Sequence, residues 1–497
     1  MTGTVPIPDR LARHGDRPAI VEPAGVWSFG RLDLLANDTA VRLLAGRDDL
    51  GGDRVAVLAE PGHRFVTAAF GAWRAGGVVV PMLPSHPEPE LRFLLDDAGA
   101  DVIVVTPSHA RLAHDLADGR EVVVVHDDRS VFDGRGSGRP LPTLTADRPA
   151  LMIHTSGTTG RPKGVLHTHA SIAAQVDAMI DAWGWTGDDR TILVLPLNHV
   201  HGLVNVTLTA LAVGAISEAP GSFVAAEVWD RFASGEITVF MAVPTVYARL
   251  VTAWEAADEP TRQRWSLGAR ELRLMVCGSA ALPVATLARW RELTGHTLLE
   301  RYGMSELGMT LSNTLERREP GHVGWPFPGV EVRIVDDHGD DVATGQSGEL
   351  LVRGPNVFRE YWGRPDATSA AFVDGWFKTG DVAIVESEGY RLLGRSSVDI
   401  IKSGGEKISA IEIEETFRQH PAVADLAVVG IPDDEWGERV AAAVVAGPGP
   451  RPDPDGLRAW GKKRLAAAKV PTRWLIVDDL PRNTLGKVVK PTLREWF

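Results

Sequence analysis

Short runs of valine and isoleucine alternate with helix-forming segments through the first third of this chain, and that alternation restricts the folds it can adopt. Continuous β-branched runs between helices are typical of parallel strands that are covered on both faces. The pattern predicts strands at 55–58, 77–81, 101–105 and 121–125, helices at 65–75 and 90–98, and further strands at 191–195, 239–243 and 273–276. It therefore indicates an α/β fold of stacked, mostly parallel sheets flanked by helices.

The pattern changes near residue 320, because alternating apolar and polar residues at 329–335 and 348–354 are typical of half-buried strands. These strands predict a smaller, more antiparallel β subdomain. A boundary is expected at Gly394-Arg395, followed by a compact α+β tail of about 100 residues. At 497 residues the chain exceeds the size of one ordinary core. We therefore predict a large N-terminal domain at 1–394 and a small C-terminal domain at 395–497.

The formal net charge of −13 argues against nucleic acid as the main partner, because no basic surplus is available to neutralise phosphates. A nucleotide held in a local pocket is compatible with that charge. The single cysteine, Cys277, excludes an intrachain disulfide and suits a reducing compartment, and its place at a strand end disfavours a catalytic thiol. The first residues lack the pattern of a targeting segment, and no apolar run approaches the ~20 residues of a membrane span. These features predict a cytoplasmic protein without a membrane span.

A Gly-rich segment at 156–164, Ser-Gly-Thr-Thr-Gly-Arg-Pro-Lys-Gly, lies between an expected strand and a helix expected from Val165 onward. Its glycines allow the backbone to approach a ligand closely, and its hydroxyls, N–H groups and Lys163 suit phosphate oxygens. It differs from a Walker A loop, because Pro162 precedes the lysine and Gly164 follows it. A flexible surface linker is the disfavoured alternative, because linkers rarely carry Pro-Lys-Gly after Thr-Thr-Gly.

Four further segments carry side chains suited to a nucleotide. Residues 301–306, Arg-Tyr-Gly-Met-Ser-Glu, offer an aromatic face for a base, a hydroxyl for phosphate and a carboxylate for Mg²⁺, although a strand-to-helix turn explains them equally well. The others are an acid at an expected tight turn, a candidate hinge followed by a strand and a Gly-rich loop, and a lysine at a Gly turn: 376–381, 394–408 and 481–487. Taken alone, Lys487 is more typical of a solvated surface lysine.

Together and in this order, the five segments resemble the adenylate-forming superfamily of acyl-CoA synthetases, nonribosomal peptide adenylation domains and luciferases. The resemblance covers nearly the whole chain. It implies an enzyme that uses ATP, Mg²⁺ and coenzyme A: a carboxylate attacks the α-phosphate of ATP, and a thiol then displaces AMP from the acyl-adenylate. It also implies that the small domain is mobile and rotates between the two steps about a hinge at Ser397.

By the pattern of that superfamily, Lys487 reaches carboxylate and phosphate oxygens, Ser305 contacts the α-phosphate and Glu306 binds Mg²⁺; these three form the implied catalytic set. The Gly-rich loop would hold the β- and γ-phosphates. Tyr302 would stack on adenine, Asp381 would hold the ribose and Arg395 would steady the nucleotide. The implied nucleotide-binding residues are Thr155, Ser156, Gly157, Thr158, Thr159, Gly160, Lys163, Tyr302, Gly303, Met304, Asp381 and Arg395, and the implied CoA-binding residues are Lys402, Ser403, Gly404 and Gly405.

Segments 242–247, 278–283 and 300–304 resemble the malonyl-CoA synthetase branch. The acyl substrate is expected to contact His199, Ser279, Arg301 and Met309. Arg301 could pair with a second carboxylate through two parallel hydrogen bonds. It could equally pair with a neighbouring acid such as Glu300. A metal site at His199 and His201 is disfavoured, because no third ligand is evident.

The leading substrate is therefore malonate or methylmalonate, with no nucleic-acid partner and an unknown oligomeric state. Departures from the superfamily pattern leave other acids open: Asn198, Ser305, His154 and Trp325. The alternatives are a CoA ligase for a larger hydrophobic or biosynthetic acid, possibly specialised for thioesterification of preformed acyl-AMP, or a free-standing carrier-protein adenylation enzyme. A luciferase-type oxidation is disfavoured. A non-catalytic nucleotide-binding protein is also disfavoured, since the expected catalytic side chains are all present.

Overall fold

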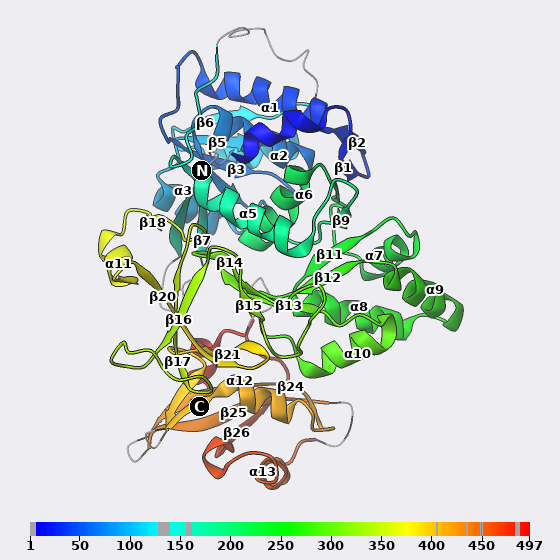
Figure 1. The fold of residues 1–497 in the computed structure, drawn as a ribbon, viewed down its shortest axis with the longest axis vertical. Helices are drawn as coiled ribbons and strands as arrows, with labels where there is room; N and C mark the ends of the chain where they lie inside the picture. Colours follow the sequence, from blue (N-terminus) through cyan, green and yellow to red (C-terminus); the bar gives the residue numbers. More distant parts are fainter. Residues whose placement is uncertain are drawn as a thin grey trace.

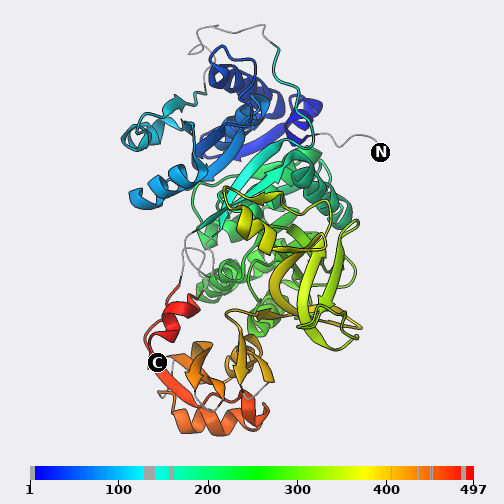
Figure 2. The same cartoon turned by 90° about the vertical axis from the view of Figure 1, so that its left-hand side faces the viewer.

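The structure, a computed structural model, describes residues 6–127, 140–155, 162–403, 406–433, 436–447, 449, 451–482 and 488–497, with the backbone alone for Lys407. The strands of these residues form four sheets. Figure 1 shows the residues after 400, in orange and red, as a separate lobe at the end opposite the N-terminal region, and Figure 2 shows the same separation from the side. None of the helices in the described ranges is long and apolar enough to cross a membrane.

The N-terminal Val/Ile runs build one sheet, which is covered by helices on both faces. Its strands in spatial order are β18 (Glu360–Tyr361), β8 (Lys163–Thr168), β7 (Pro149–Thr155), β4 (Val78–Met82), β3 (Arg54–Leu58), β5 (Val102–Val105) and β6 (Glu121–Val124). The five strands from β7 to β6 run parallel. One face packs on α3 (Glu88–Ala98) and α4 (Ala110–Leu116), and the other on α1 (Phe29–Leu44) and α2 (His63–Arg74). Double coverage explains why these strands are apolar throughout.

A second sheet extends across the middle of the chain. Its strands in spatial order are β15 (Trp325–Pro326), β14 (Gly308–Ser312), β13 (Leu299–Met304), β12 (Leu274–Cys277), β11 (Val239–Ala242), β9 (Arg190–Ile192), β10 (Ile216–Glu218), β1 (Pro18–Glu22) and β2 (Gly25–Ser28). One face shares an aromatic core with α7 (Ala225–Ala233), α8 (Pro244–Ala256), α9 (Glu259–Arg270) and α10 (Val284–Thr294). The run from β13 to β1 is parallel. The predicted α/β class is therefore confirmed.

The two large sheets share one hydrophobic core, to which α5 (His169–Trp183), α6 (Thr209–Val213) and the π-helix η4 (His201–Leu208) contribute. The buried Trp183 indole at the end of α5 donates a hydrogen bond of 2.9 Å to the Ser312 hydroxyl on β14. This contact joins the helix to the second sheet. The core therefore fixes β7, β8, β13 and β14 relative to one another, and these strands carry the candidate site.

The third sheet is antiparallel, as predicted, and contains β16 (Glu331–Val335), β17 (Ser347–Arg353), β20 (Trp376–Glu386), β19 (Phe372–Val373) and β21 (Gly389–Arg395), with α11 (Pro365–Ala370) beside it. The C-terminal lobe has its own cores. Its sheet holds β23 (Glu406–Ser409), β22 (Ile400–Ser403), β25 (Gly437–Ala446), β24 (Val423–Asp433) and β26 (Arg473–Val477), with α12 (Ala410–Phe417), α13 (Pro454–Gly461) and α14 (Lys490–Arg494). Short 3₁₀ helices complete the described elements: η1 (Ile7–His14), η2 (Pro107–His109) and η5 (Ala467–Lys469).

Two local predictions are wrong. Residues from Val165 were expected to be helical, but Lys163–Thr168 form strand β8 and the helix begins at His169. Thr168 and Ser171 form a capping box, which fixes the helix start at that point. The expected tight turn at Asp381 is instead the interior of β20.

Candidate nucleotide and acyl site

A tight hairpin places the segment 301–306 at the centre of the candidate site. Residues Leu299–Met304 form β13 and pair with β14, so the segment is not a strand-to-helix turn. A Cβ on Gly303 would lie 1.9 Å from the Gly308 carbonyl oxygen. Glycine is therefore required where the two strands cross closely.

Three side chains that the sequence placed around a nucleotide lie in one hydrogen-bonded chain. The Tyr302 hydroxyl donates to Asp381 Oδ2 at 2.5 Å, and Arg395 Nε lies 3.0 Å from Asp381 Oδ1. Asp381 is buried, and the two partners come from β13 and from the end of β21. The carboxylate is thus held in one orientation by an aromatic hydroxyl and a guanidinium.

Glu306 lies just past the same hairpin strand and is also buried. Its Oε1 accepts a hydrogen bond of 2.8 Å from the hydroxyl of Tyr361 on β18. Burial raises the pKa of Glu306, and the hydrogen bond from Tyr361 opposes that rise. Lys163, the first residue of β8, also contacts this tyrosine, because its Nζ lies 5.1 Å from the centre of the Tyr361 ring.

A buried histidine fixes the backbone of the hairpin turn. Burial lowers the pKa of His167 to about 4, so its ring is neutral at physiological pH. Its Nε2 lies 2.7 Å from the Ser305 carbonyl oxygen and donates to it, while Nδ1 faces the Ser171 hydroxyl at 3.1 Å. Ser305 and Met304 are therefore carried on a backbone that is tied to α5 and β8.

The structure describes the residues at the two ends of the Gly-rich loop. Thr155 at the end of β7 pairs in register with Lys163 at the start of β8. Several residues of the predicted sets lie outside the described residues: Ser156, Gly157, Thr158, Thr159, Gly160, Gly404, Gly405 and Lys487. The described residues show that the loop joins two antiparallel strands.

Arg301 lies on β13 within a second polar cluster. The residue is only 3% exposed, and its Nη1 lies 3.5 Å from the Ser279 hydroxyl. That hydroxyl lies 3.1 Å from His201 Nδ1. Ser279 holds a φ of 70°, a conformation that side chains other than glycine rarely adopt, and it directs the hydroxyl between the histidine and the arginine.

The guanidinium of Arg301 has no acidic partner among the described residues, and its Nε and Nη2 make no hydrogen bond there. Burial lowers the pKa of Arg301 to about 10. Burial of the His201 ring and the nearby charge of Arg301 together lower the pKa of His201 well below its usual range. A Cβ on Gly278 would lie 2.7 Å from the guanidinium carbon. Gly278, directly after β12, thus leaves room for a guanidinium that no acid among the described residues neutralises.

Glu300 does not pair with Arg301, although the sequence allowed it to. Successive residues of β13 point to opposite faces, and Glu300 Oε1 accepts a hydrogen bond of 2.8 Å from the Gly321 backbone N–H. Burial raises the pKa of Glu300 to about 7. The structure therefore has no ion pair between Arg301 and Glu300, and no other acid among the described residues pairs with Arg301.

Met309 and His199 complete the predicted acyl set. Met309 is buried on β14 opposite Gly303. A Cβ on Gly303 would lie 2.6 Å from the methyl group of Met309. His199 is partly buried and precedes η4. Neither the π-helix nor its Asn205 was predicted from the sequence. Asn205 is fully buried, and both of its amide atoms are unpaired among the described residues. A π-helix in this position is a common sign of a functional site.

The predicted hinge and CoA segment follow β21. Ser397 is exposed, while the preceding Ser396 donates from its hydroxyl to the Gly380 carbonyl at 2.9 Å. Lys402 and Ser403 end β22, where the Lys402 backbone N–H donates to Glu438 at 2.7 Å. Asp381 and Arg395 thus stand on one side of Ser397, and the Lys402–Ser403 pair on the other.

Known families account for this arrangement. Residues 7–362 match the family described as AMP-binding enzyme, and residues 412–487 match the AMP-binding enzyme C-terminal domain. The chain belongs to the AMP-binding enzyme family. The predicted superfamily and fold class are confirmed.

Proteins with named activities resemble the chain in sequence and fold. The mitochondrial malonate–CoA ligase ACSF3 of Mus musculus is 42% identical over 99% of this chain and 90% of its own length. ATP-bound MatB from Rhodopseudomonas palustris is 33% identical, with a TM-score of 0.88 over 98% of each chain. A malonyl-CoA ligase in a ternary product complex with methylmalonyl-CoA and AMP is 37% identical, with a TM-score of 0.68 over 94% of this chain and 97% of that chain.

The two solved structures differ in how closely their whole-chain arrangement matches this one. The product complex has the higher sequence identity but the lower TM-score. The arrangement of the chain is therefore nearer to that of ATP-bound MatB than to that of the product complex.

Proposed function

We propose that this protein is an AMP-forming acid–CoA ligase that activates malonate or methylmalonate as an acyl-adenylate and transfers it to coenzyme A. The observation that carries the choice of acid is the buried Arg301 guanidinium with no acidic partner among the described residues. An uncompensated buried cation is costly, and a second carboxylate would neutralise it on binding. The malonate–CoA ligases among the relatives support the same substrate class.

The chain of Tyr302, Asp381 and Arg395 supports the nucleotide side of the proposal. Asp381 is a buried carboxylate held by Tyr302 and Arg395, and a carboxylate so oriented suits the vicinal hydroxyls of a ribose. The Tyr302 ring lies beside that carboxylate and would carry the adenine on its face. The loop between Thr155 and Lys163 would receive the β- and γ-phosphates.

Adenylation requires two anions to approach each other. Glu306 is a buried carboxylate whose Oε1 accepts a hydrogen bond from the neutral Tyr361 hydroxyl, and a carboxylate oxygen in this position fits Mg²⁺. When bound there, Mg²⁺ would offset the charge of the phosphates. Ser305 would position the α-phosphate, and Lys487 would draw the acid carboxylate and the phosphate oxygens together.

The acyl side would bind a dicarboxylate by one end. Arg301, with its Nε and Nη2 unpaired, can form two parallel hydrogen bonds to a carboxylate, and the Ser279 hydroxyl can add a third. The neutral His201 ring keeps the pocket from gaining a second cation. The other carboxylate of the acid is then free to attack the α-phosphate.

Thioester formation would follow a rotation of the C-terminal domain, 395–497, about Ser397. The exposed position of Ser397 between β21 and β22 supports a hinge there. The difference in TM-score between the ATP-bound and product structures supports two arrangements of such chains. Rotation would withdraw Lys487 and bring the segment of Lys402, Ser403, Gly404 and Gly405 to the CoA thiol.

Acid-dependent ATP–pyrophosphate exchange tests the proposal. Malonate and methylmalonate should support exchange, while acetate, a medium-chain fatty acid and a bulky aryl acid should not. Added CoA should convert the diacids to thioesters that mass spectrometry detects. Exchange with a hydrophobic acid alone would retain the ligase and reject this substrate. Thioester formation only from supplied acyl-AMP would indicate an enzyme of the second step.

The variant Lys487→Ala tests whether Lys487 acts in adenylation. It should abolish exchange and spare thioester formation from supplied malonyl-AMP, because the lysine would act only in adenylation. Equal loss of both steps would reject that role.

The cytosol is our proposed compartment. The single cysteine, Cys277, is buried and unpaired, which suits a reducing environment. Because the mouse relative is described as mitochondrial, fractionation of the cells that make this protein is the direct test.

A further inference from the structure

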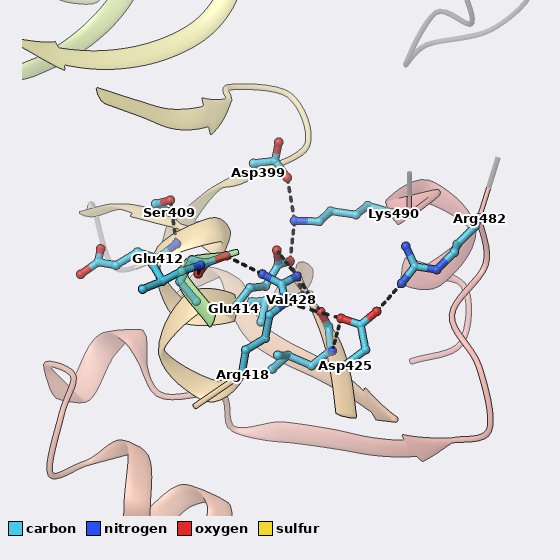
Figure 3. A network of polar contacts seen from close by, with 12 residues as sticks. Asp399, Ser409, Glu412, Glu414, Arg418, Asp425, Val428, Arg482 and Lys490 are labelled. Carbon is cyan, nitrogen blue, oxygen red and sulfur yellow. Dashed lines mark hydrogen bonds and ion pairs between the residues drawn. The ribbon is translucent and has the colours of Figure 1, made fainter. Parts of the chain in front are cut away.

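A buried lysine in the C-terminal lobe joins two acids from different elements. Lys490 is 7% exposed, and its Nζ lies 2.6 Å from Asp399 Oδ1 and 2.8 Å from Glu414 Oε1. Figure 3 shows the ammonium group between the two carboxylates. Burial opposes the charge, but the two acids outweigh it and raise the pKa of Lys490, so the side chain stays cationic.

Asp399 connects this lysine to the predicted hinge. Its Oδ2 accepts a hydrogen bond of 3.1 Å from the Arg395 backbone N–H, and its carbonyl accepts one of 2.8 Å from Ala410 at the start of α12. Arg395 in turn contacts Asp381 through its side chain. A continuous chain of polar contacts therefore runs from Asp381 through the hinge to Lys490.

Lys490 also begins the helix that follows the segment 483–487. Before that segment, Arg482 forms an ion pair with Asp425 on β24, and Arg482 forms an antiparallel bridge with Val488 after it. The Val489 backbone N–H donates to the Pro481 carbonyl at 2.7 Å. The two ends of the segment are thus joined to each other, and each end is attached to the lobe by a cation.

The two attachments differ in what they reach. Arg482 contacts the lobe sheet through Asp425, and Figure 3 shows this pair at the far side of the network from Asp399. Lys490 contacts α12 and also Asp399, which lies two residues after the predicted hinge Ser397. Of the two, Lys490 is the residue whose acidic partner also contacts Arg395.

We propose that Lys490 is a positioning residue for adenylation: its ion pair with Asp399 fixes the start of α14, three residues after Lys487, relative to Arg395 and Asp381, and the action of Lys487 in adenylation depends on that anchor. This inference rests on the proposed function and names a residue that does not touch substrate. Because a positioning residue acts through geometry, its loss should lower the rate of one step more than the affinity for ATP or acid.

The test compares Lys490→Met with a matched control, Lys469→Met. Lys469 also pairs with an acid of α12, Glu412, at 2.7 and 2.8 Å, but its side chain is more exposed and its partner is 15 residues after the predicted hinge. Lys490→Met should slow ATP–pyrophosphate exchange with malonate at least ~10-fold at saturating substrates, with little change in either KM. Thioester formation from supplied malonyl-AMP should fall less than ~3-fold, and Lys469→Met should leave both rates near wild type.

Conservative and compensating variants separate positioning from folding. Lys490→Arg keeps the cation and should recover most of the exchange rate. If Lys490→Met does not fold, the double variant Glu414→Gln, Lys490→Met removes the most buried acid together with the cation and should show the same selective loss. Thermal melting of each variant is measured alongside both rates.

An unchanged exchange rate in a folded Lys490→Met, or equal loss of both steps in proportion to the fall in Tm, would overturn the inference. If Lys487→Ala abolishes exchange while Lys490→Met does not slow it, only the inference fails. If the wild type shows no acid-dependent exchange, the proposed function fails and this inference fails with it.

Discussion

The two halves of the candidate site contrast in how their polar groups are satisfied. On the nucleotide side, Asp381 contacts Tyr302 and Arg395, and Glu306 accepts a hydrogen bond from Tyr361. On the acyl side, Arg301 is buried without an acidic partner among the described residues, and Asn205 has two unpaired amide atoms there. The first half is preorganised, whereas the second half has contacts left for a ligand to complete.

This difference separates two demands on one site. A nucleotide is common to the whole family, so its contacts can be built into the fold at little cost in stability. Selecting a diacid requires a buried cation that is unsatisfied until the right ligand arrives, and that cation destabilises the free protein. Mutations should therefore affect stability in opposite directions on the two sides.

The largest expected effect is on the preorganised side. Glu306→Gln should lower the rate of ATP–pyrophosphate exchange by roughly 10²–10³-fold, because the amide cannot replace a carboxylate as a ligand of Mg²⁺. Raising the Mg²⁺ concentration should recover part of the loss. The exposed Glu331→Gln on β16 is the control. An exchange rate within ~2-fold of wild type would exclude Glu306 from the metal site.

On the unsatisfied side, activity and stability should move apart. Arg301→Met should lower kcat/KM for malonate by an amount equivalent to about 1.5–3 kcal/mol of transition-state stabilisation, because a charged hydrogen-bonded contact is lost. The same change removes a buried unpaired charge, so the free protein should melt at a higher temperature than wild type. Kinetics with each acid and thermal melting without ligand provide the two readouts.

Arg318→Met is the matched control for that experiment. Arg318 is partly buried, with its Nη1 donating to the Thr297 carbonyl at 2.9 Å, and it lies outside the proposed acyl contacts. It should leave the malonate kinetics unchanged. If Arg301→Met lowers both stability and activity, the guanidinium has a structural partner and the contrast between the two halves is wrong.

The same contrast marks how far the sequence alone could go. The Val/Ile runs predicted the parallel sheets because their period is local, and the ordered motifs predicted which side chains meet. Tyr302 and Asp381 are 79 positions apart, so only the family pattern could place them together. That pattern could not show that Arg301 and Glu300 face opposite ways, because this follows from the strand conformation of Leu299–Met304, and the sequence was equally compatible with a strand-to-helix turn.

The misses have physical causes as well. Val165 follows a Gly-rich loop and precedes alanines, which favours a helix locally, but pairing with β7 and β18 makes Lys163–Thr168 a strand. The π-helix at His201–Leu208 has no periodic signature in eight residues. Lys490 was overlooked because a lysine three positions after Lys487 gives no sign of burial. In each case tertiary contacts outweighed local preference.

Glu300 extends the comparison to the other face of β13. Its pKa is raised by burial from its ordinary 4.5 to about 7, so the folded protein binds the proton more tightly than the unfolded chain. The stabilising contribution is fully present below pH 4.5 and is lost as the pH rises to about 7. The free energy of unfolding of Glu300→Gln, relative to wild type, should therefore be about 2 kcal/mol higher at pH 8.5 than at pH 5.5.

Denaturant unfolding at the two pH values, with the exposed Glu331→Gln as the control, measures that gain. Oε1 of the glutamine can still accept the hydrogen bond from Gly321, so the local contact is preserved. If the difference in unfolding free energy between Glu300→Gln and wild type is the same at both pH values, Glu300 retains the ordinary pKa of an acid.

The smallest expected effect tests how much of the preorganisation comes from a single hydroxyl. Tyr361→Phe keeps the ring beside Lys163 but removes the donor to Glu306, which should raise the free energy of activation for exchange by about 0.5–1.5 kcal/mol. Because that hydrogen bond lowers the pKa of Glu306 against the effect of burial, its loss should raise the pKa further. The acid limb of the exchange rate should then shift to higher pH, since a protonated Glu306 cannot bind Mg²⁺. A loss as large as that of Glu306→Gln, with no shift of the acid limb, would place the Tyr361 hydroxyl itself among the catalytic groups.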